Sequence, residues 1–242
     1  MTDNKEVMLQ NYTRREFRQG LEAGKFQAAI IPTGSIEQHL EHLPFEHDIA
    51  SSTWVAQQVA LRMYPKVIVA VPMAVGISEH HMKHKGSLTA KPGSWLAVLF
   101  DAVECFARHG IENILILNGH GGNVQPVNSI LRQWRLFFES TAPGVNLHFH
   151  PYWNLIPRAL IDEHMVTKSA PGHAQEFETS LAMHMFPEKI RHDAMQDQED
   201  KTPLEADAEK GRILSEEAVN RVVEYLEAMM EGKTLLDVGE RY

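Results

Sequence analysis

Apolar residues gather in four short runs along the chain, each bounded by polar or turn-forming residues. The runs are rich in Val, Ile and Leu and are too short for helices, which is typical of strands buried in a sheet. They cover residues 28–32, 67–71, 114–117 and 145–149. The pattern therefore predicts four buried strands.

Between these runs, apolar residues recur at helical spacing, and the last third of the chain is mainly helical in pattern. The predicted helices cover residues 14–23, 49–63, 94–108, 124–138, 176–185 and 203–230. Strands that alternate with helices predict a mostly parallel sheet covered by helices on both faces. No internal repeat or low-complexity linker interrupts the pattern, so we expect one domain over residues 1–242. The acidic stretch 193–200 is expected to be a solvated loop rather than an acidic recognition site.

Composition narrows the class of protein. The chain has 242 residues, 43% hydrophobic and 23% charged, enough for a full core. Its net charge of -9, without a basic cluster, argues against a nucleic-acid partner. No apolar run is long enough for a membrane span or a signal peptide, so a cytoplasmic location without membrane contact is expected. The single cysteine, Cys105, excludes an intrachain disulfide, and we expect it in the core.

Histidines and carboxylates crowd three segments that follow predicted strands or can fold back to their ends. The segments are GSIEQHLEHLPFEHD (34–48), NGHGGN (118–123) and GHAQEFET (172–179). In open α/β sheets, ligands bind beyond the carboxyl ends of the strands. Imidazole and carboxylate are ligands that suit Zn, Mn and Fe. This placement predicts a metal site.

The first segment offers more ligands than one ion needs. Glu37 and His39 are separated by one residue, which points both to the same side of an extended chain. Asp48 follows nine residues after His39. Spacing alone does not separate these three from the other candidates in the segment, which are Glu41, His42, Glu46 and His47.

The other two segments each carry a competing interpretation. His120 lies in a glycine-rich turn before a helix, a place that often binds phosphate, but the Walker lysine and the GxGxxG spacing are missing. A metal-bound His120, with glycines clearing space for substrate, fits better. His173 precedes a predicted helix, and Glu176 and Glu178 fall in its first turn, where carboxylates also stabilise the helix dipole.

The three segments, read in order, resemble the creatininase (creatinine amidohydrolase) family. The matching strings are TGSIEQHLEHLP followed by Asp48, then NGHGGN, then GHAQEFETS, over roughly residues 28–185. The resemblance implies a three-layer α/β/α sandwich and a homo-oligomer, commonly a hexamer. It also implies two divalent metal ions per chain, Zn, Mn or Fe, which serve to open a cyclic amide or remove a formyl group.

The resemblance also implies roles at the matching positions. The residues so assigned are Glu37 and His120 on one ion, His39 on the other, Asp48 as the bridge, His173 as the catalytic histidine, and Glu178 as the glutamate five residues after it.

The chain departs from the family at two places. Creatininase proper has a metal-ligating glutamate where this chain has Gly122, so we expect Glu178 to take over as a ligand of the second ion. Glu46 and His47 replace the usual glycine-threonine before the bridging aspartate. These departures favour the activity of a relative over hydrolysis of creatinine itself.

Substrate contacts are expected around the same ends of the strands. The segment GISEHHMKHKGSLT (76–89) resembles a family loop in which His81 matches the family histidine, while His80 and His84 are extra and are either exposed or in contact with substrate. Trp153 either packs in the core or closes the pocket. The predicted substrate-binding residues are His81, Trp153, Gly121 and Gly122.

The function expected from the resemblance is a dinuclear metal-dependent hydrolase. Two bridged ions lower the pKa of a water and polarise a carbonyl, so that hydroxide attacks a small polar amide or N-formyl substrate. His173, or Glu178 if it is not tied to metal, then moves the proton. One alternative is ring opening, by C–C cleavage, of a cyclic polyhydroxy diketone similar to 3-dehydro-scyllo-inosose. Another is a non-catalytic protein with a closed structural metal site.

Overall fold

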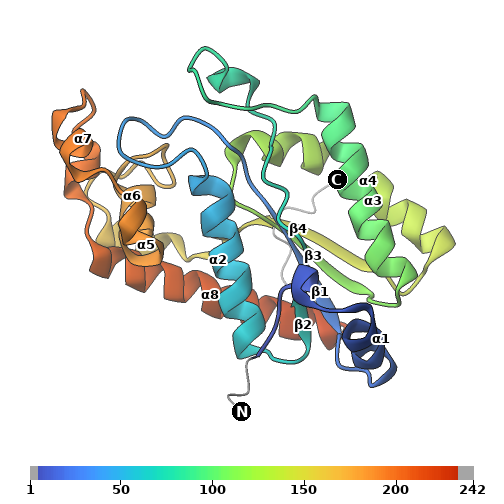
Figure 1. The fold of residues 1–242 in the computed structure, drawn as a ribbon. Helices are drawn as coiled ribbons and strands as arrows, with labels where there is room; N and C mark the ends of the chain where they lie inside the picture. Colours follow the sequence, from blue (N-terminus) through green and yellow to red (C-terminus); the bar gives the residue numbers. More distant parts are fainter. Residues whose placement is uncertain (1–4, 234–242) are drawn as a thin grey trace.

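The computed structural model describes residues 5–233, which are built around a four-stranded sheet (Figure 1). The strand order is β2-β1-β3-β4, and all neighbouring strands are parallel. The strands are β1 (Ala28–Thr33), β2 (Val67–Val69), β3 (Asn113–Asn118) and β4 (Asn146–Pro151). The predicted parallel sheet is confirmed, with strand ends that differ from the predicted ones by at most two residues.

Eight α-helices connect and cover the strands within the described range. They are α1 (Arg14–Glu22), α2 (His47–Arg62), α3 (Pro92–Arg108), α4 (Gly121–Thr141), α5 (Arg158–His164), α6 (Glu176–Met185), α7 (His192–Asp197) and α8 (Ala208–Met230). Helix α1 begins where Thr13 and Glu16 form a capping box, in which each side chain accepts a hydrogen bond from the backbone amide of the other residue.

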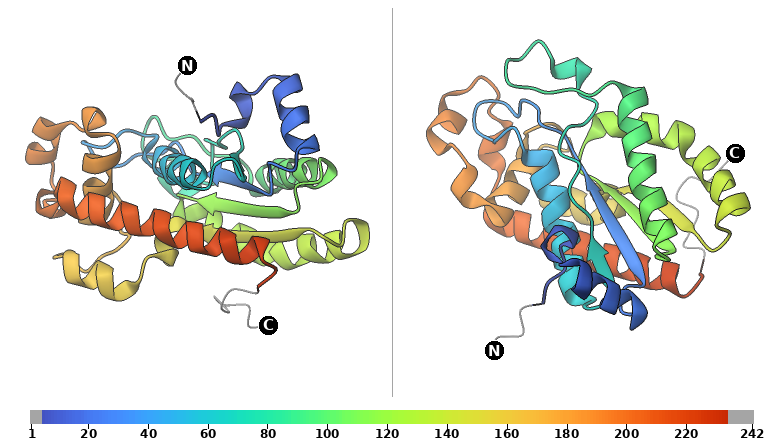
Figure 2. Two further views of the ribbon diagram at one scale, coloured as in Figure 1. Left: turned by 90° about the horizontal axis from the view of Figure 1, so that it is seen from below. Right: turned by 45° about the vertical axis from the view of Figure 1, so that its right-hand side comes forward.

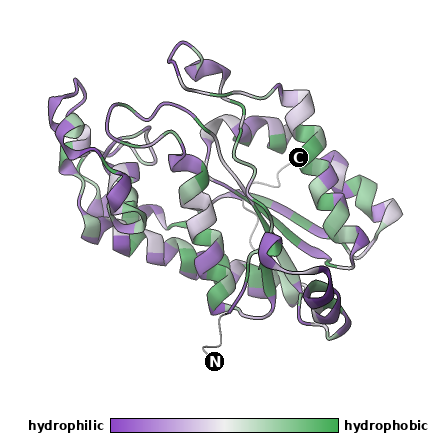
Figure 3. Ribbon diagram, viewed as in Figure 1, coloured by the Kyte–Doolittle hydropathy of each residue, from purple (hydrophilic) through white to green (hydrophobic). Residues whose placement is uncertain are grey.

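Alternating residues of the buried strands face two separate hydrophobic cores. On one face, Ala28 and Ile30 pack with residues of α2 and α8. On the other, Ala29 and Ile31 pack with residues of α3 and α4. Figure 2 shows helices on both sides of the sheet, and Figure 3 shows hydrophobic residues concentrated at the centre while α1 is strongly hydrophilic. The arrangement is a three-layer α/β/α sandwich.

The strand order places a topological switch between β1 and β3. The chain leaves β1 toward β2 on one side and later returns to β3 on the other, which separates the loops that follow β1 and β3. Figure 1 shows the loops after β1 and β2 extending from the same end of the sheet. A side chain at Gly119 would place its Cβ 2.1 Å from the carbonyl oxygen of Asp48. Glycine there lets the end of β3 pack directly against the start of α2.

Three local predictions are wrong. Most of the acidic stretch 193–200 belongs to α7 and not to a loop, because Met195 is buried and holds this segment on the protein. Cys105 is exposed, since the buried face of α3 is formed by Trp95, Leu99, Val103 and Phe106 and the cysteine lies off that stripe. The predicted helix 203–230 begins at Ala208, where the Asp207 side chain accepts a hydrogen bond from the Lys210 amide.

Among residues 5–233, no helix is both long and apolar enough to cross a membrane. Residues 1–4 and 234–242 lie outside the described part of the chain, and the expectation of one domain over residues 1–242 stays a prediction.

Candidate metal centre

The three segments singled out in the sequence meet at the switch between β1 and β3. Glu37 and His39 lie on the loop after β1, and Asp48 is in the first turn of α2. His120 is the N-cap residue of α4, directly after β3, and Glu178 is in the first turn of α6. All five side chains are buried.

Asp48 lies between the two central histidines. Its Oδ1 is 3.0 Å from Nε2 of His39, and its Oδ2 is 2.9 Å from Nδ1 of His120. Oε1 of Glu37 is 3.4 Å from the same His120 nitrogen. One carboxylate is thus shared between two imidazoles, which is the arrangement of a bridging ligand.

Each central histidine commits its other ring nitrogen to a backbone carbonyl. Nδ1 of His39 donates to the Glu37 carbonyl at 3.0 Å, and Nε2 of His120 donates to the Ile77 carbonyl at 3.0 Å. These hydrogen bonds turn the remaining nitrogens, which carry the lone pairs of the neutral rings, toward the carboxylates. Metal-ligating histidines are oriented in this way.

The neighbouring carboxylates strongly raise the pKa values of both histidines. Burial alone would lower the pKa of His39, but Asp48 outweighs it and raises that pKa to about 9. Burial is likewise outweighed at His120, whose pKa the Asp48 and Glu37 carboxylates raise to about 10. Burial would raise the pKa of Asp48, but the two histidines hold it well below its usual range. The centre therefore stabilises positive charge at the inward nitrogens.

Glu178 completes the cluster from the side of α6. Its Oε2 lies 3.9 Å from Nε2 of His39 and accepts a hydrogen bond from the Ala174 amide at 2.5 Å. Burial raises the pKa of Glu178 to about 7. Together with His39 and Asp48 it forms a group whose ligand atoms lie within 4.8 Å of one another.

Two further groups with the same geometry involve Glu37. One combines it with His80 and His120, the other with His39 and His173. Oε2 of Glu37 is buried and has no hydrogen-bond partner among the described residues. The other oxygen, Oε1, lies 3.4–3.7 Å from nitrogens of His81, His120 and His173. A carboxylate with one unpartnered oxygen and imidazole nitrogens around the other fits a divalent ion such as Zn, Mn or Fe.

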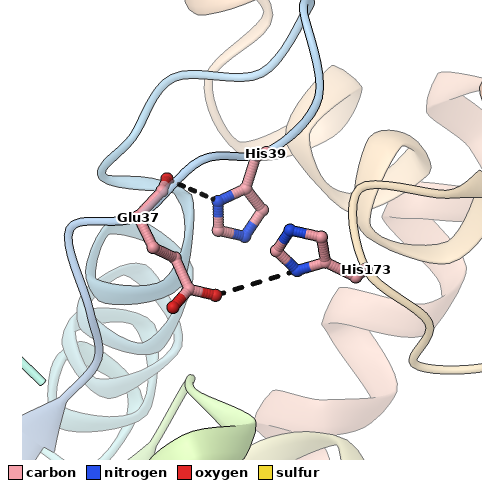
Figure 4. A group of neighbouring side chains, drawn as sticks. All are labelled: Glu37, His39 and His173. Atoms are coloured by element: carbon pink, nitrogen blue, oxygen red, sulfur yellow. Dashed lines mark hydrogen bonds and ion pairs between the residues drawn. The ribbon is translucent and has the colours of Figure 1, made fainter. Parts of the chain in front are cut away.

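His173 borders the centre on its accessible side. Figure 4 shows Glu37, His39 and His173 facing one another, with Nδ1 of His173 3.7 Å from Oε1 of Glu37. Nε2 of His173 lies 2.7 Å from the Gln38 carbonyl. Its side chain is 31% exposed. Burial, followed by the charge on His39, lowers the pKa of His173 to about 4.

The four predicted substrate-binding residues are placed differently from one another. His81 lies near the centre, with Nε2 3.5 Å from Oε1 of Glu37 and its ring stacked on His173 at 4.4 Å. Gly121 is exposed and has open space where a side chain would begin. Gly122 is tightly confined, because a Cβ there would lie 2.2 Å from the Ile77 carbonyl oxygen. Trp153 is half-buried and packs against the core that contains α8.

The remaining candidates of the first and third segments have other surroundings. Glu176 accepts hydrogen bonds from Lys210 and from two backbone amides and lies apart from the cluster. Nε2 of His42 forms a hydrogen bond with the Thr179 hydroxyl at 2.9 Å. His47 is buried with its ring 5.0 Å from that of His39.

Several supporting residues had no role assigned from the sequence. The Gln38 amide lies between the rings of His81 and His173, 3.0 and 2.8 Å from their nitrogens. Ser78 lies 3.1 Å from Nε2 of His120, and Asn118 donates to the His120 carbonyl at 2.6 Å. Gln38 and Asn118 belong to the histidine-rich segments 34–48 and 118–123, and this position is the feature of the sequence from which their roles could have been predicted. Ser78 is brought in only by folding of the loop after β2.

Fold and donor set together define an α/β protein with a candidate metal centre at the switch point of a parallel sheet. The sequence model of the creatininase family (creatinine amidohydrolase) matches residues 10–206, and the chain belongs to this family.

Curated relatives of the chain carry three different names. It is 30% identical over 176 residues to the mycofactocin precursor peptide peptidase of Mycobacterium ulcerans, covering 69% of this chain and 61% of the relative. It is 28% identical over 204 residues to the 3-dehydro-scyllo-inosose hydrolase of Thermotoga maritima, and this match covers 81% of this chain and 61% of the relative. It is 25% identical over 207 residues to the creatinine amidohydrolase of Pseudomonas putida, and this match covers 80% of this chain and 77% of the relative. The match thus spans about three fifths of the length of the first two relatives.

Solved structures share the fold. A crystal structure of creatinine amidohydrolase (creatininase) superposes with a TM-score of 0.81 at 21% identity, covering 93% of this chain and 98% of the other. A manganese form of creatininase gives a TM-score of 0.78 at 21% identity, covering 93% and 99%. At this identity the likeness shows the fold, and the expected three-layer architecture is confirmed.

Proposed function

We propose that this chain is a hydrolase that depends on two divalent metal ions bound at the candidate centre. The observation that carries the proposal is the Asp48 carboxylate, whose two oxygens lie 3.0 and 2.9 Å from the inward ring nitrogens of His39 and His120. A carboxylate so placed would bridge two ions. A closed structural site with one ion would not need a shared ligand of this kind.

The donors divide into two sets around Asp48. Glu37 and His120 would hold one ion, His39 and Glu178 the other, and Zn, Mn and Fe all suit these ligands. When bound, such a pair of ions polarises a carbonyl and makes water nucleophilic near neutral pH. Gly122 offers no ligand, so Glu178 supplies the carboxylate of the second set.

His173 is the proton carrier of the proposal. Because its pKa lies near 4, the ring is neutral at neutral pH and Nδ1, which points toward Glu37, is free to accept a proton. Its contact with the Gln38 carbonyl holds Nε2 and thereby fixes the ring. Partial exposure lets a substrate reach the same nitrogen, which can then pass the proton to the leaving atom. General acid-base steps of this kind contribute about 100-fold to 10,000-fold to the rate.

The substrate class follows from the lining of the centre. Histidines and carboxylates surround it, which favours a small polar carbonyl compound, and we place amides and N-formyl compounds first. Two relatives are named for cleavage of amide bonds, the creatinine amidohydrolase and the peptidase. Ring opening of a cyclic polyhydroxy diketone is the second candidate, favoured by the relative named 3-dehydro-scyllo-inosose hydrolase. We further propose that the chain forms a homo-oligomer, as a hexamer.

The proposal is tested by turnover of cyclic amides, N-formyl compounds, short peptides and cyclic diketones with wild-type protein and His173→Ala. We expect turnover of one class, and a loss of about 100-fold to 10,000-fold in kcat for His173→Ala with metal content unchanged. The matched control is His192→Ala, which removes an exposed histidine on α7. If His173→Ala lost its metal or failed to fold, His173 would be a structural residue and the proton-transfer role would be wrong.

A further inference from the structure

One histidine beside the centre has no role in the proposed reaction. His80 lies on the loop between β2 and α3, in a short helical turn formed by Glu79–His81. Its ring is parallel to that of His120, with planes 8° apart and centroids separated by 5.7 Å. Its ligand atom and those of Glu37 and His120 lie within 4.8 Å of one another. We propose that His80 is a further protein ligand of the ion that Glu37, His120 and the shared Asp48 would hold.

Two of the three groups of candidate ligands share no residue. Glu37, His80 and His120 form one, and His39, Asp48 and Glu178 form the other, while the third group takes Glu37 and His39 from these two and adds His173. Because Asp48 also reaches the first group with Oδ2, the first ion would have four protein donors and the second would have three. The second ion would keep a position open for water, as catalytic zinc sites do, and the first would take substrate only as a fifth ligand.

The local backbone makes room for the His80 ring. A Cβ at Gly122 would lie 3.0 Å from Cε1 of His80 and 2.4 Å from Nε2 of His120. A side chain at this position of α4 would compete with the ring for the same space. The glycine and the extra histidine are therefore compatible with each other, whereas a bulky residue at position 122 is not compatible with this place of His80.

Of the three histidines on this loop, His80 has the surroundings that best suit a metal ligand. His81 is already engaged by Glu37 and the Gln38 amide. The His84 side chain is exposed, and its ring centroid lies 6.3 Å from that of His81. His80 is also exposed, so its ring can adjust to the distance of about 2.0–2.1 Å that zinc–nitrogen bonds need.

The inference rests on the proposed two-metal centre, and the experiment separates the two. Wild-type protein, His80→Ala and the matched control His84→Ala are stripped with a chelator and titrated with Zn²⁺ against a chromophoric competitor. The absorption spectrum of the Co²⁺-loaded proteins is recorded as a second readout. We expect His80→Ala to weaken one of two binding steps by at least about 10-fold, since even indirect partners of metal ligands cost 10-fold to 100-fold when lost. The Co²⁺ spectrum should change with it, while His84→Ala behaves as wild type.

Two outcomes overturn the inference. If wild type binds two ions and His80→Ala binds both with unchanged affinity and spectrum, His80 is no ligand, although the two-metal centre stands. If wild type binds no ion tightly, the centre and the inference fail together. Equal melting temperatures of the stripped proteins confirm that the exposed substitution leaves the fold intact.

Discussion

At the scale of single residues, the centre depends on how protons are distributed over two histidines. His39 and His120 each donate one ring N–H to a backbone carbonyl. The carboxylates raise their pKa values to about 9 and about 10, so each inward nitrogen also holds a proton at neutral pH unless an ion replaces it. Binding of a metal must then expel these protons, because only the neutral ring is a ligand.

This distribution predicts that Zn²⁺ binding near pH 7.5 releases about two protons per chain from the chelated protein. Calorimetric titration in buffers of different ionisation enthalpy measures the number. His39→Asn should lower it by about one, whereas replacement of His42, whose pKa burial lowers to about 4, should leave it unchanged. Release close to zero in wild type would show that both rings are already neutral.

Two adjacent glycines at the start of α4 give a matched pair of substitutions. Gly122→Ala places a methyl group against the Ile77 carbonyl and the His120 ring, while Gly121→Ala meets nothing within 4 Å. We expect Gly122→Ala to lower the free energy of unfolding by about 1–3 kcal/mol and to weaken metal binding. Gly121→Ala should be neutral or stabilise by up to about 1 kcal/mol. Chemical denaturation and metal titration check both, and equal effects would contradict the close packing at Gly122.

From the sequence we could predict which segments supply candidate ligands, but not which residues of the first segment would face the centre. Alternation in an extended chain placed Glu37 and His39 together, and the glycine-rich turn pointed to His120. The choice among Glu41, His42, Glu46 and His47 needed the folded contacts. His42 is turned to Thr179 and Glu46 to Lys189, which no spacing rule predicts. The metal-binding roles of Glu37, His39, Asp48, His120 and Glu178, and the catalytic roles of His173 and Glu178, stay predictions.

At the scale of elements, α6 both carries Glu178 and is fastened to α8. Glu176 is fully buried and accepts hydrogen bonds from Lys210 on α8 and from the amides of Val166 and Thr167. Burial opposes its ionisation, but Lys210 and the amides hold the pKa of Glu176 below its usual range. This glutamate serves the placement of α6, whereas Glu178, two residues later, faces the centre.

Glu176→Ala should therefore destabilise the protein by about 2–4 kcal/mol, because it leaves two amides and a lysine without their acceptor. The exposed Glu209→Ala on α8 is the control and should change stability little. Urea denaturation measures both. A loss of metal binding without loss of stability in Glu176→Ala would place Glu176 in the centre instead.

Helices and strands were predicted well where apolar residues repeat at regular spacing. They were predicted poorly where a single contact determines whether or where an element forms. The four strands and α6 follow the pattern closely. The segment of α7 reads as acidic and solvated, yet burial of the single side chain of Met195 makes it helical. The start of α8 depends on the Asp207 cap, a local hydrogen bond that hydrophobic spacing does not reveal.

At the scale of the whole molecule, the centre joins residues more than a hundred positions apart in the chain, such as Glu37 and His173. Parallel strands make this predictable, because their carboxyl ends share one edge of the sheet. The order β2-β1-β3-β4, which puts the ends of β1 and β3 side by side, was not evident from the sequence and came from the pairing itself. The family match, over residues 10–206, covers this shared architecture.

The central claim is a pair of metal ions that serve a hydrolytic reaction. The most direct test measures metal content per chain in protein purified without added metal, together with turnover of the four substrate classes named above. We expect about two ions per chain, with turnover that is lost on chelation and restored by Zn²⁺, Mn²⁺ or Fe²⁺. One ion or none after reconstitution, without turnover of any class, would contradict it and leave a structural metal site as the better description.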